Sequence, residues 1–144
     1  MPELFADAEA DCCGLIGAFL MEFSQLETMI QARLAQAIEL PEEFSNIIMS
    51  AFDFARLCAV TEAILITEQA EREGEIRKIF NECKRLNEDR VRVAHGLITH
   101  DLDGSFAIRA VSRSSFKEAW HFGNGEVQGL IDEAQGLMKR VLLV

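Results

Sequence analysis

The 144-residue sequence predicts an all-α fold, a four-helix bundle with a small β-hairpin inserted before the C-terminal helices. Three observations support this prediction. Apolar residues recur at steps of three and four over long segments, which is the period of a helix. Only Pro2 and Pro41 interrupt the chain, and an Asp-Gly pair separates two short β-prone runs. The length and the hydrophobic fraction of 49% fit a single domain over residues 1–144.

The first helix is expected from about Asp7 to Ile38, because one continuous apolar stripe runs along this segment. At ~1.5 Å per residue such a helix would be about 45 Å long, which is long for a small domain. The stripe consists of Leu15, Phe19, Phe23, Leu26, Ile30, Leu34 and Ile38.

A second helix is expected from about Glu42 to Ile66, after the break at Pro41. Acidic residues in its first turn suit the positive end of the helix dipole. This segment is apolar on most sides, and such helices usually lie at the centre of a fold.

A turn is expected between Thr67 and Glu75, where the chain is polar and contains Gly74. The third helix then follows from about Glu71 to His95. We expect Gly96 to end it in the left-handed conformation that glycine readily adopts.

The hairpin is predicted from Leu97–His100 and residues 105–111, joined by a turn at Asp103 and Gly104. After it, Ser115 and Glu118 form a capping-box pattern, which predicts a short helix through Trp120. Asn124 is the expected cap of a final helix. The apolar face of that helix comprises Val127, Leu130, Ile131, Ala134, Leu137, Met138, Val141 and Leu142.

The net charge of −10 is unevenly distributed. Residues 1–75 carry three basic and fifteen acidic residues, a net −12, whereas residues 76–144 carry eleven and nine, a net +2. An acidic protein repels nucleic acid at long range, so a polyanion would have to approach the C-terminal half.

No apolar run approaches the ~18 residues of a membrane span. No basic leader precedes the first apolar stretch, so we expect a cytoplasmic protein without membrane contact.

The four cysteines, Cys12, Cys13, Cys58 and Cys83, are expected to be free thiols in apolar helical surroundings. They form no Cys-x-x-Cys pair, and the histidines lack the spacing of a zinc site. We therefore expect neither a metal nor a cofactor.

The candidate functional residues of the sequence lie close together in the segment Arg90-Val91-Arg92-Val93-Ala94-His95-Gly96. On a helical wheel Arg90 falls within the apolar stripe of the third helix, and a guanidinium there needs a partner or lines a site. The purely structural interpretation is that Arg90 forms an ion pair in the core and that His95 caps the end of the helix.

This Arg-x4-His-Gly pattern resembles the signature of the HEPN superfamily, whose members often read Arg-Asn-x-x-Ala-His-Gly at the end of the third helix. The segment Phe19-Leu20-Met21-Glu22-Phe23-Ser24-Gln25-Leu26-Glu27 is similar to their opening helix. The expected order of helices and hairpin also resembles several HEPN subfamilies, so the likeness covers most of the chain.

The resemblance implies a metal-independent endoribonuclease of a toxin–antitoxin or antiphage-defence type, active as a homodimer. In the reaction that the resemblance implies, the RNA 2′-hydroxyl attacks the adjacent phosphate, His95 is the general acid and base, and Arg90 binds phosphate. Arg92 and Arg85 could add phosphate contacts. An antitoxin or another protein partner is possible in this class.

The alternative is a catalytically inactive HEPN-like module for dimerisation or protein interaction. Val91 stands where many members carry asparagine or another polar residue, and a valine side chain cannot hydrogen-bond. The long first helix and the acidic surface also favour this alternative.

Overall fold

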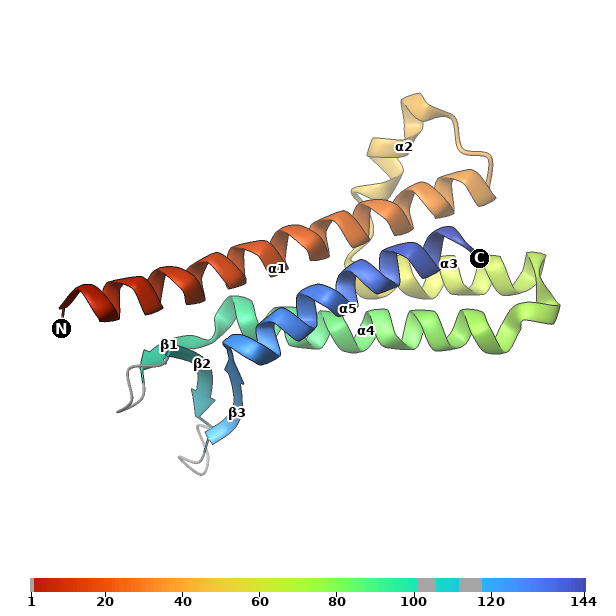
Figure 1. Cartoon of the computed structure of the whole chain (residues 1–144). Helices are drawn as coiled ribbons and strands as arrows, with labels where there is room; N and C mark the ends of the chain where they lie inside the picture. The colour runs from red at the N-terminus through yellow and green to blue at the C-terminus, as the bar shows by residue number, and fades with distance from the viewer. Residues whose placement is uncertain (1, 101–105, 112–117) are drawn as a thin grey trace.

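The computed structural model describes residues 2–100, 106–111 and 118–144 of the chain. Most of these residues are helical, and the strands form a small antiparallel sheet before the last helix (Figure 1). The elements in order are α1 (Pro2–Ala37), α2 (Glu42–Met49), α3 (Phe54–Glu68), the 3-10 turn η1 (Ala70–Arg72), α4 (Glu73–His95), β1 (Leu97–His100), β2 (Phe106–Val111), β3 (Glu118–Gly123) and α5 (Asn124–Leu142).

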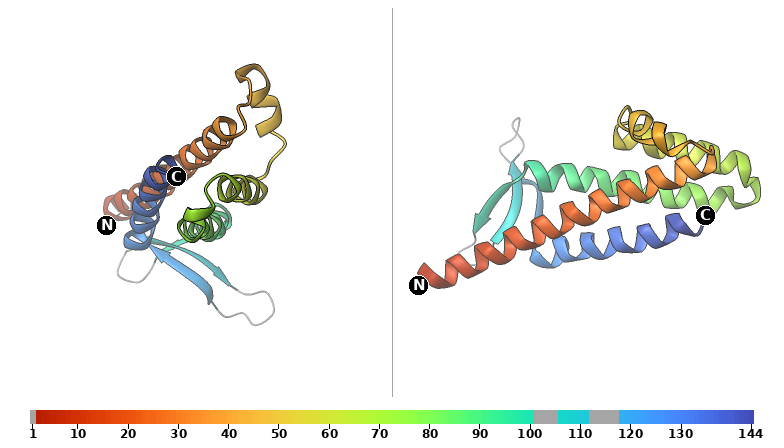
Figure 2. Two further views of the ribbon diagram at one scale, coloured as in Figure 1. Left: turned by 90° about the vertical axis from the view of Figure 1, so that its right-hand side faces the viewer. Right: turned by 90° about the horizontal axis from the view of Figure 1, so that it is seen from above.

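The core lies between the four long helices, with α1 along α5 and α3 along α4 (Figure 2). The predicted stripe of α1 is buried over most of its length, because its members at three- and four-residue steps face the other helices. Ile38 is an exception and is 43% exposed. The buried members are Phe19, Phe23, Leu26, Ile30 and Leu34.

The prediction of one helix from Glu42 to Ile66 is wrong, because the segment forms two helices. Helix α2 ends at Met49 with Ser50 as its C-cap, and Asp53 begins α3 as its N-cap. The Asp53 carboxylate accepts a hydrogen bond from the Arg56 amide at 2.8 Å. Such a cap satisfies an otherwise unpaired N–H of the first turn, so it lets a new helix begin in a new direction.

The turn between α1 and α2 is tight. Glu39 has a φ of 52°, the left-handed region that favours glycine. The Leu40 amide donates to the Ala35 carbonyl at 2.9 Å across this turn. The acidic first turn predicted for the second helix is confirmed, with Glu42 and Glu43 following Pro41.

Helix α4 follows the prediction at its end and departs from it at its beginning. The short 3-10 turn Ala70–Arg72 connects α3 to α4, and Gly74 lies inside α4 instead of forming a turn. The helix ends at His95, as predicted. Gly96 is nevertheless not left-handed, because its φ of −75° and ψ of 161° carry the chain straight into β1.

The predicted hairpin is confirmed by the antiparallel pairing of β1 with β2, in which Ile98 lies opposite Ile108. Its expected turn at Asp103 and Gly104 lies outside the described residues. The short helix predicted through Trp120 is wrong, because Glu118–Gly123 forms strand β3 along the other side of β2. Ser115 lies outside the described residues. Backbone pairing with an adjacent strand outweighs a local capping pattern.

The core-facing side of α5 is confirmed at Val127, Leu130, Ile131, Ala134, Leu137 and Val141. Its N-cap is Gly123 without a side-chain hydrogen bond, so the predicted cap by Asn124 is wrong. Leu142, expected on the apolar face, is 58% exposed.

The four cysteines are free, as predicted, and Cys13 differs from the others in being exposed. No helix in the described part of the chain combines the length and apolar character required to cross a membrane.

Candidate functional site

Arg90 projects from α4 towards α1, onto the ring of Phe23. Its Cζ lies 5.2 Å from the centroid of that ring, a cation–π geometry. Phe23 in turn packs on Phe54 of α3, with the ring centroids 4.6 Å apart. The wheel prediction that Arg90 faces the apolar side of its helix therefore agrees with its half-buried position.

The guanidinium of Arg90 has few polar partners. Its Nη2 donates to Oδ1 of Asn87 at 2.9 Å, one turn earlier in α4. Its Nε is buried and has no hydrogen-bond partner among the residues that the structure describes. Among the described residues, no carboxylate forms an ion pair with Arg90. A cation withdrawn from water without an anion carries a desolvation cost, so this guanidinium retains the capacity to bind one.

His95 is the last residue of α4, and its side chain is exposed. It forms no hydrogen bond or ion pair within residues 2–100, 106–111 and 118–144. Five residues along a helix rotate a side chain by ~500°, which places His95 about 140° from Arg90 around the axis. On an ideal helix the Cα–Cβ bonds of the two residues therefore point to different sides of α4.

Arg92 and Arg85, the weaker phosphate-binding candidates, are paired with acids. Nη1 of Arg92 lies 3.2 Å from Oδ1 of Asp89, and Nη2 of Arg85 lies 3.8 Å from Oε1 of Glu133. Burial raises the pKa of Glu133 by more than the neighbouring Arg85 lowers it. Both arginines are largely exposed, so these are weak surface pairs that an incoming phosphate could replace.

Apolar side chains are exposed around the end of α4. Val91 is 41% exposed, and Leu97 and Ile98 of β1 are 70% and 43% exposed. Exposed apolar surface beside a candidate site is typical of a contact with another molecule.

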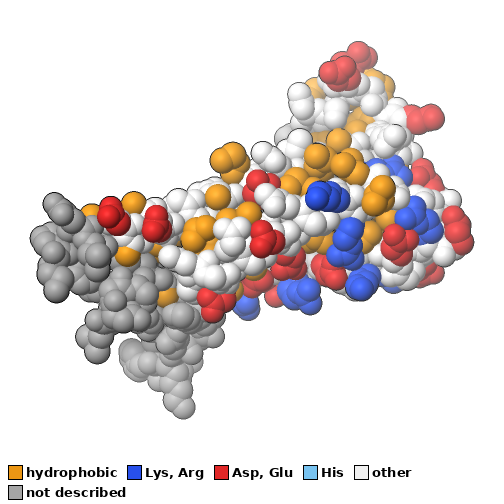
Figure 3. Space-filling view, viewed as in Figure 1, with side chains coloured by type: hydrophobic (Ala, Val, Ile, Leu, Met, Phe, Trp, Pro, Cys, Tyr) orange, Lys and Arg blue, Asp and Glu red, His pale blue; other side chains and the backbone are white. Residues whose placement is uncertain are grey.

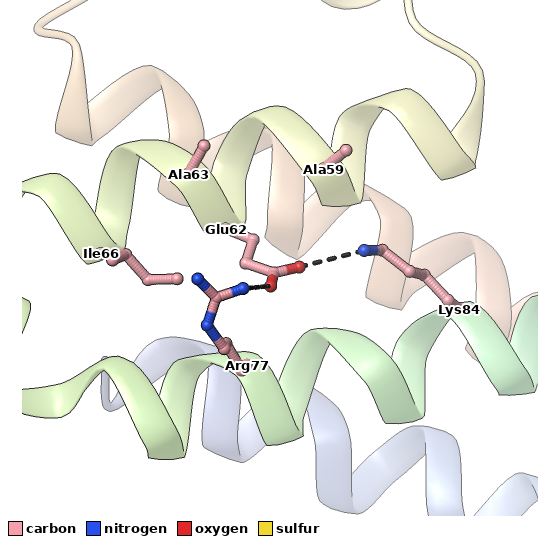
Figure 4. A pocket seen from close by; sticks show the side chains of 6 residues that line it. All are labelled: Ala59, Glu62, Ala63, Ile66, Arg77 and Lys84. Atoms are coloured by element: carbon pink, nitrogen blue, oxygen red, sulfur yellow. Dashed lines mark hydrogen bonds and ion pairs between the residues drawn. The ribbon is translucent and has the colours of Figure 1, made fainter.

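A second polar cluster, which the sequence did not indicate as a site, lies between α3 and α4. Glu62 is only 8% exposed, and its carboxylate pairs with Lys84 at 3.0 Å and Arg77 at 3.5 Å (Figure 4). These residues line an open cavity of about 400 Å³ with Ala59, Ala63 and Ile66. The sequence feature that could have indicated this cluster is Glu62, the one charged residue between Leu57 and Ile66.

The Glu62 cluster is complete without a ligand. Arg77 also pairs with Glu73 at 2.7 Å, so each cation has an acidic partner. We therefore assign the cluster a structural role, joining α3 to α4 across their exposed edge.

No group of three or more His, Cys, Asp or Glu side chains that could hold a metal ion occurs among the described residues. The side chains of His100 and His121 lie outside that part of the chain.

In comparisons with models of protein families, with curated proteins and with solved structures, nothing matches this chain.

Proposed function

We propose that the chain is a metal-independent endoribonuclease with a HEPN-like bundle, active as a homodimer of the toxin–antitoxin or antiphage-defence type. The observation that carries this proposal is the guanidinium of Arg90, which is half-buried on Phe23 and has no carboxylate partner among the described residues. A purely structural arginine at this depth would be expected to have one.

The proposed reaction is transfer of a phosphodiester to the neighbouring 2′-oxygen. An imidazole of His95 accepts the 2′-hydroxyl proton while that oxygen bonds to phosphorus. The bond from phosphorus to the 5′-oxygen breaks, and the imidazolium formed from His95 returns its proton to this leaving oxygen. Arg90 offsets the charge that develops on the non-bridging oxygens. The products are a 2′,3′-cyclic phosphate and a 5′-hydroxyl.

The proposal requires two protomers because of the angular separation on α4. With His95 about 140° from Arg90, a complete site needs an arginine and a histidine from facing chains. The exposed Val91, Leu97 and Ile98 supply apolar surface beside His95 for such a contact.

Charge limits how RNA could approach. The segment 84–95 carries four basic and two acidic residues in a chain of net charge −10. Long-range attraction of RNA is therefore weak, and a short single-stranded substrate is the best candidate.

The test is cleavage of labelled single-stranded RNA in the presence of a chelator. We expect cleavage by the wild type and a loss of about 100-fold or more in Arg90→Met and in His95→Ala. Lys78→Gln, at an exposed position outside the proposed site, serves as the control for a lost surface cation. A substrate with a 2′-deoxyribose at the cleaved position should remain intact.

Mixing the two inactive variants tests the shared site. If each site combines Arg90 of one chain with His95 of the other, heterodimers of Arg90→Met and His95→Ala regain part of the activity. A wild-type protein that is dimeric by sedimentation and yet inactive on RNA at high concentration would contradict the proposal.

A second candidate is the inactive interaction module, which the 41% exposure of Val91 favours. In this case Val91, Leu97 and Ile98 form a contact surface and Arg90 binds an acidic group of the partner chain. Dimerisation that is lost in Val91→Glu, together with an absence of cleavage, would support it.

A further inference from the structure

We propose that the outer face of α2 is a docking site for a basic amphipathic helix of another protein. This inference is independent of the α4 site and of the proposed ribonuclease activity. It rests on the exposure of an apolar face, on the weak attachment of α2, and on the acidic residues around it.

The outer face of α2 is apolar. Phe44, Ile47 and Ile48 lie at positions i, i+3 and i+4 and therefore share one side of the helix. They are 51%, 69% and 38% exposed, and Ile38, which follows α1 and precedes α2 by four residues, is 43% exposed. We call these four residues the α2 patch. This spacing matches the helix-in-groove and helix-on-helix modes of peptide recognition.

Helix α2 is weakly attached to the rest of the structure. Met49 is its one buried residue, and α2 stands apart from the four long helices in two views (Figures 1 and 2). An eight-residue helix is marginal by itself, because its few hydrogen bonds do not offset the cost of nucleation. A partner covering the α2 patch would supply the packing that this helix lacks.

The segment that carries the α2 patch is acidic. Arg33 and Arg56 flank it, and Arg56 pairs with Asp53 at 3.7 Å. Residues 34–55 contain Glu39, Glu42, Glu43 and Asp53, and neither lysine nor arginine. Figure 3 shows acidic side chains beside apolar ones on the part of the surface that α2 forms. A partner that presents apolar residues flanked by lysine or arginine is complementary to this surface in both respects.

The conformation of Glu39 determines where its carboxylate lies. Its φ of 52° places a side-chain-bearing residue where glycine is favoured, at a cost of about 1 kcal/mol. The bonds from the Leu40 amide to the Ala35 carbonyl and from the Glu39 amide to the Gln36 carbonyl show that this conformation ends α1, as left-handed residues commonly do. Here it places a carboxylate directly after the exposed Ile38.

Charge also argues against the other occupants. A symmetric contact between two copies through the α2 patch would bring like-charged carboxylates together. An anionic membrane surface would be repelled by the same groups. A basic helix is the occupant that both the charge and the apolar face favour.

The test uses a synthetic amphipathic peptide of about 14 residues, made of leucine and lysine, with leucines at helical spacing. Binding to the full chain is measured by fluorescence anisotropy, and we expect a Kd on the order of 10 µM at low salt. Hydrogen exchange of the amides in residues 42–49 should slow when the peptide is bound.

Two variants address the two components of the site. The apolar variant Phe44→Ser with Ile47→Ser should weaken binding by about 10-fold. The charge variant Glu42→Lys with Glu43→Lys should weaken it by about 10-fold at low salt and less at ~0.5 M salt. All four side chains are exposed, so the fold should persist, which circular dichroism can verify.

Matched controls separate a docking site from general attraction to an acidic protein. Met21→Ser removes another exposed apolar side chain, and Glu68→Lys with Glu71→Lys reverses two exposed charges elsewhere. Neither should change the Kd by more than about twofold. A peptide of leucine and glutamate should not bind.

Four results would overturn the proposal. They are an absence of peptide binding, equal effects of the control and patch variants, binding of the glutamate peptide with similar affinity, and self-association that Ile47→Ser abolishes.

Discussion

Over its first half α4 presents Arg77 and Lys84 to the buried carboxylate of Glu62, whereas near its end it places Arg90 over the Phe23 ring. In the first region each cation has an acidic partner within 4 Å. In the second, within the described part of the chain, the guanidinium donates to one asparagine and its Nε has no partner. The same helix therefore carries a completed ion network and a cation with unused binding capacity.

The two regions show the difference between a charged side chain that is paired within the fold and one that can still bind an anion. A charge that stabilises the fold needs an opposite charge close by, since burial removes the solvation it had in water. Glu62 meets that requirement, and Arg90 does not. The comparison makes Arg90 the stronger candidate for binding an anion from outside the chain.

The largest expected effect concerns RNA cleavage. Arg90→Met should lower kcat/KM by about 100-fold or more, whereas Lys84→Met should lower it by less than about threefold. The physical reason is that Lys84 already neutralises Glu62 and has no free capacity for phosphate. Initial rates on one labelled RNA measure both values, and equal losses would remove the distinction between the two regions.

The next effect concerns stability at the Glu62 cluster. Glu62→Ala should lower the free energy of unfolding by about 2–3 kcal/mol, because it leaves Lys84 without its acidic partner and removes the ion pairs that join α3 to α4. Arg77 keeps its pair with Glu73. Glu62→Gln should cost less, since the amide still accepts hydrogen bonds. Urea unfolding followed by circular dichroism measures both changes.

Thiol labelling shows whether this loss opens the α3–α4 contact locally. Hydrogen bonding to the Cys58 side chain and burial hold the pKa of the Cys83 thiol above its usual range. Cys83 should therefore react much more slowly than the exposed Cys13. In Glu62→Ala its labelling should accelerate, and an unchanged rate in a destabilised variant would indicate that the cluster does not join the two helices.

A smaller effect is expected at Arg90 itself. Arg90→Met keeps the contact with Phe23 and removes a poorly compensated charge, so the free energy of unfolding should change by less than about 1 kcal/mol. Chemical denaturation provides the measurement. A loss above about 3 kcal/mol would indicate that Arg90 is structural, as Glu62 is.

The smallest effect is expected at the two surface pairs. Arg92→Gln and Arg85→Gln should each change the free energy of unfolding by less than about 0.5 kcal/mol, because exposed ion pairs contribute little. Each should weaken RNA binding by only severalfold at low salt, and less at high salt. Binding titrations at two salt concentrations measure this contribution.

The sequence by itself determined the elements whose residues all indicate the same structure. The α1 stripe through Phe19, Phe23 and Leu26 is buried as its period predicts, and α4 ends at His95. The pairing of β1 with β2 also follows from two short β-prone runs. In these segments local propensity and burial agree, so period and turn chemistry are sufficient.

Only the tertiary structure decided the features that depend on segments distant in sequence. Strand β3 replaced the helix predicted through Trp120 because β2 offered it a backbone partner. The network of Glu62 with Lys84 depends on how α3 packs against α4. The wheel placed Arg90 on the apolar side of its helix, but the ring beneath it and the lack of a carboxylate partner among the described residues depend on α1. These contacts join residues far apart along the chain, and local periodicity carries no information about which side chains meet.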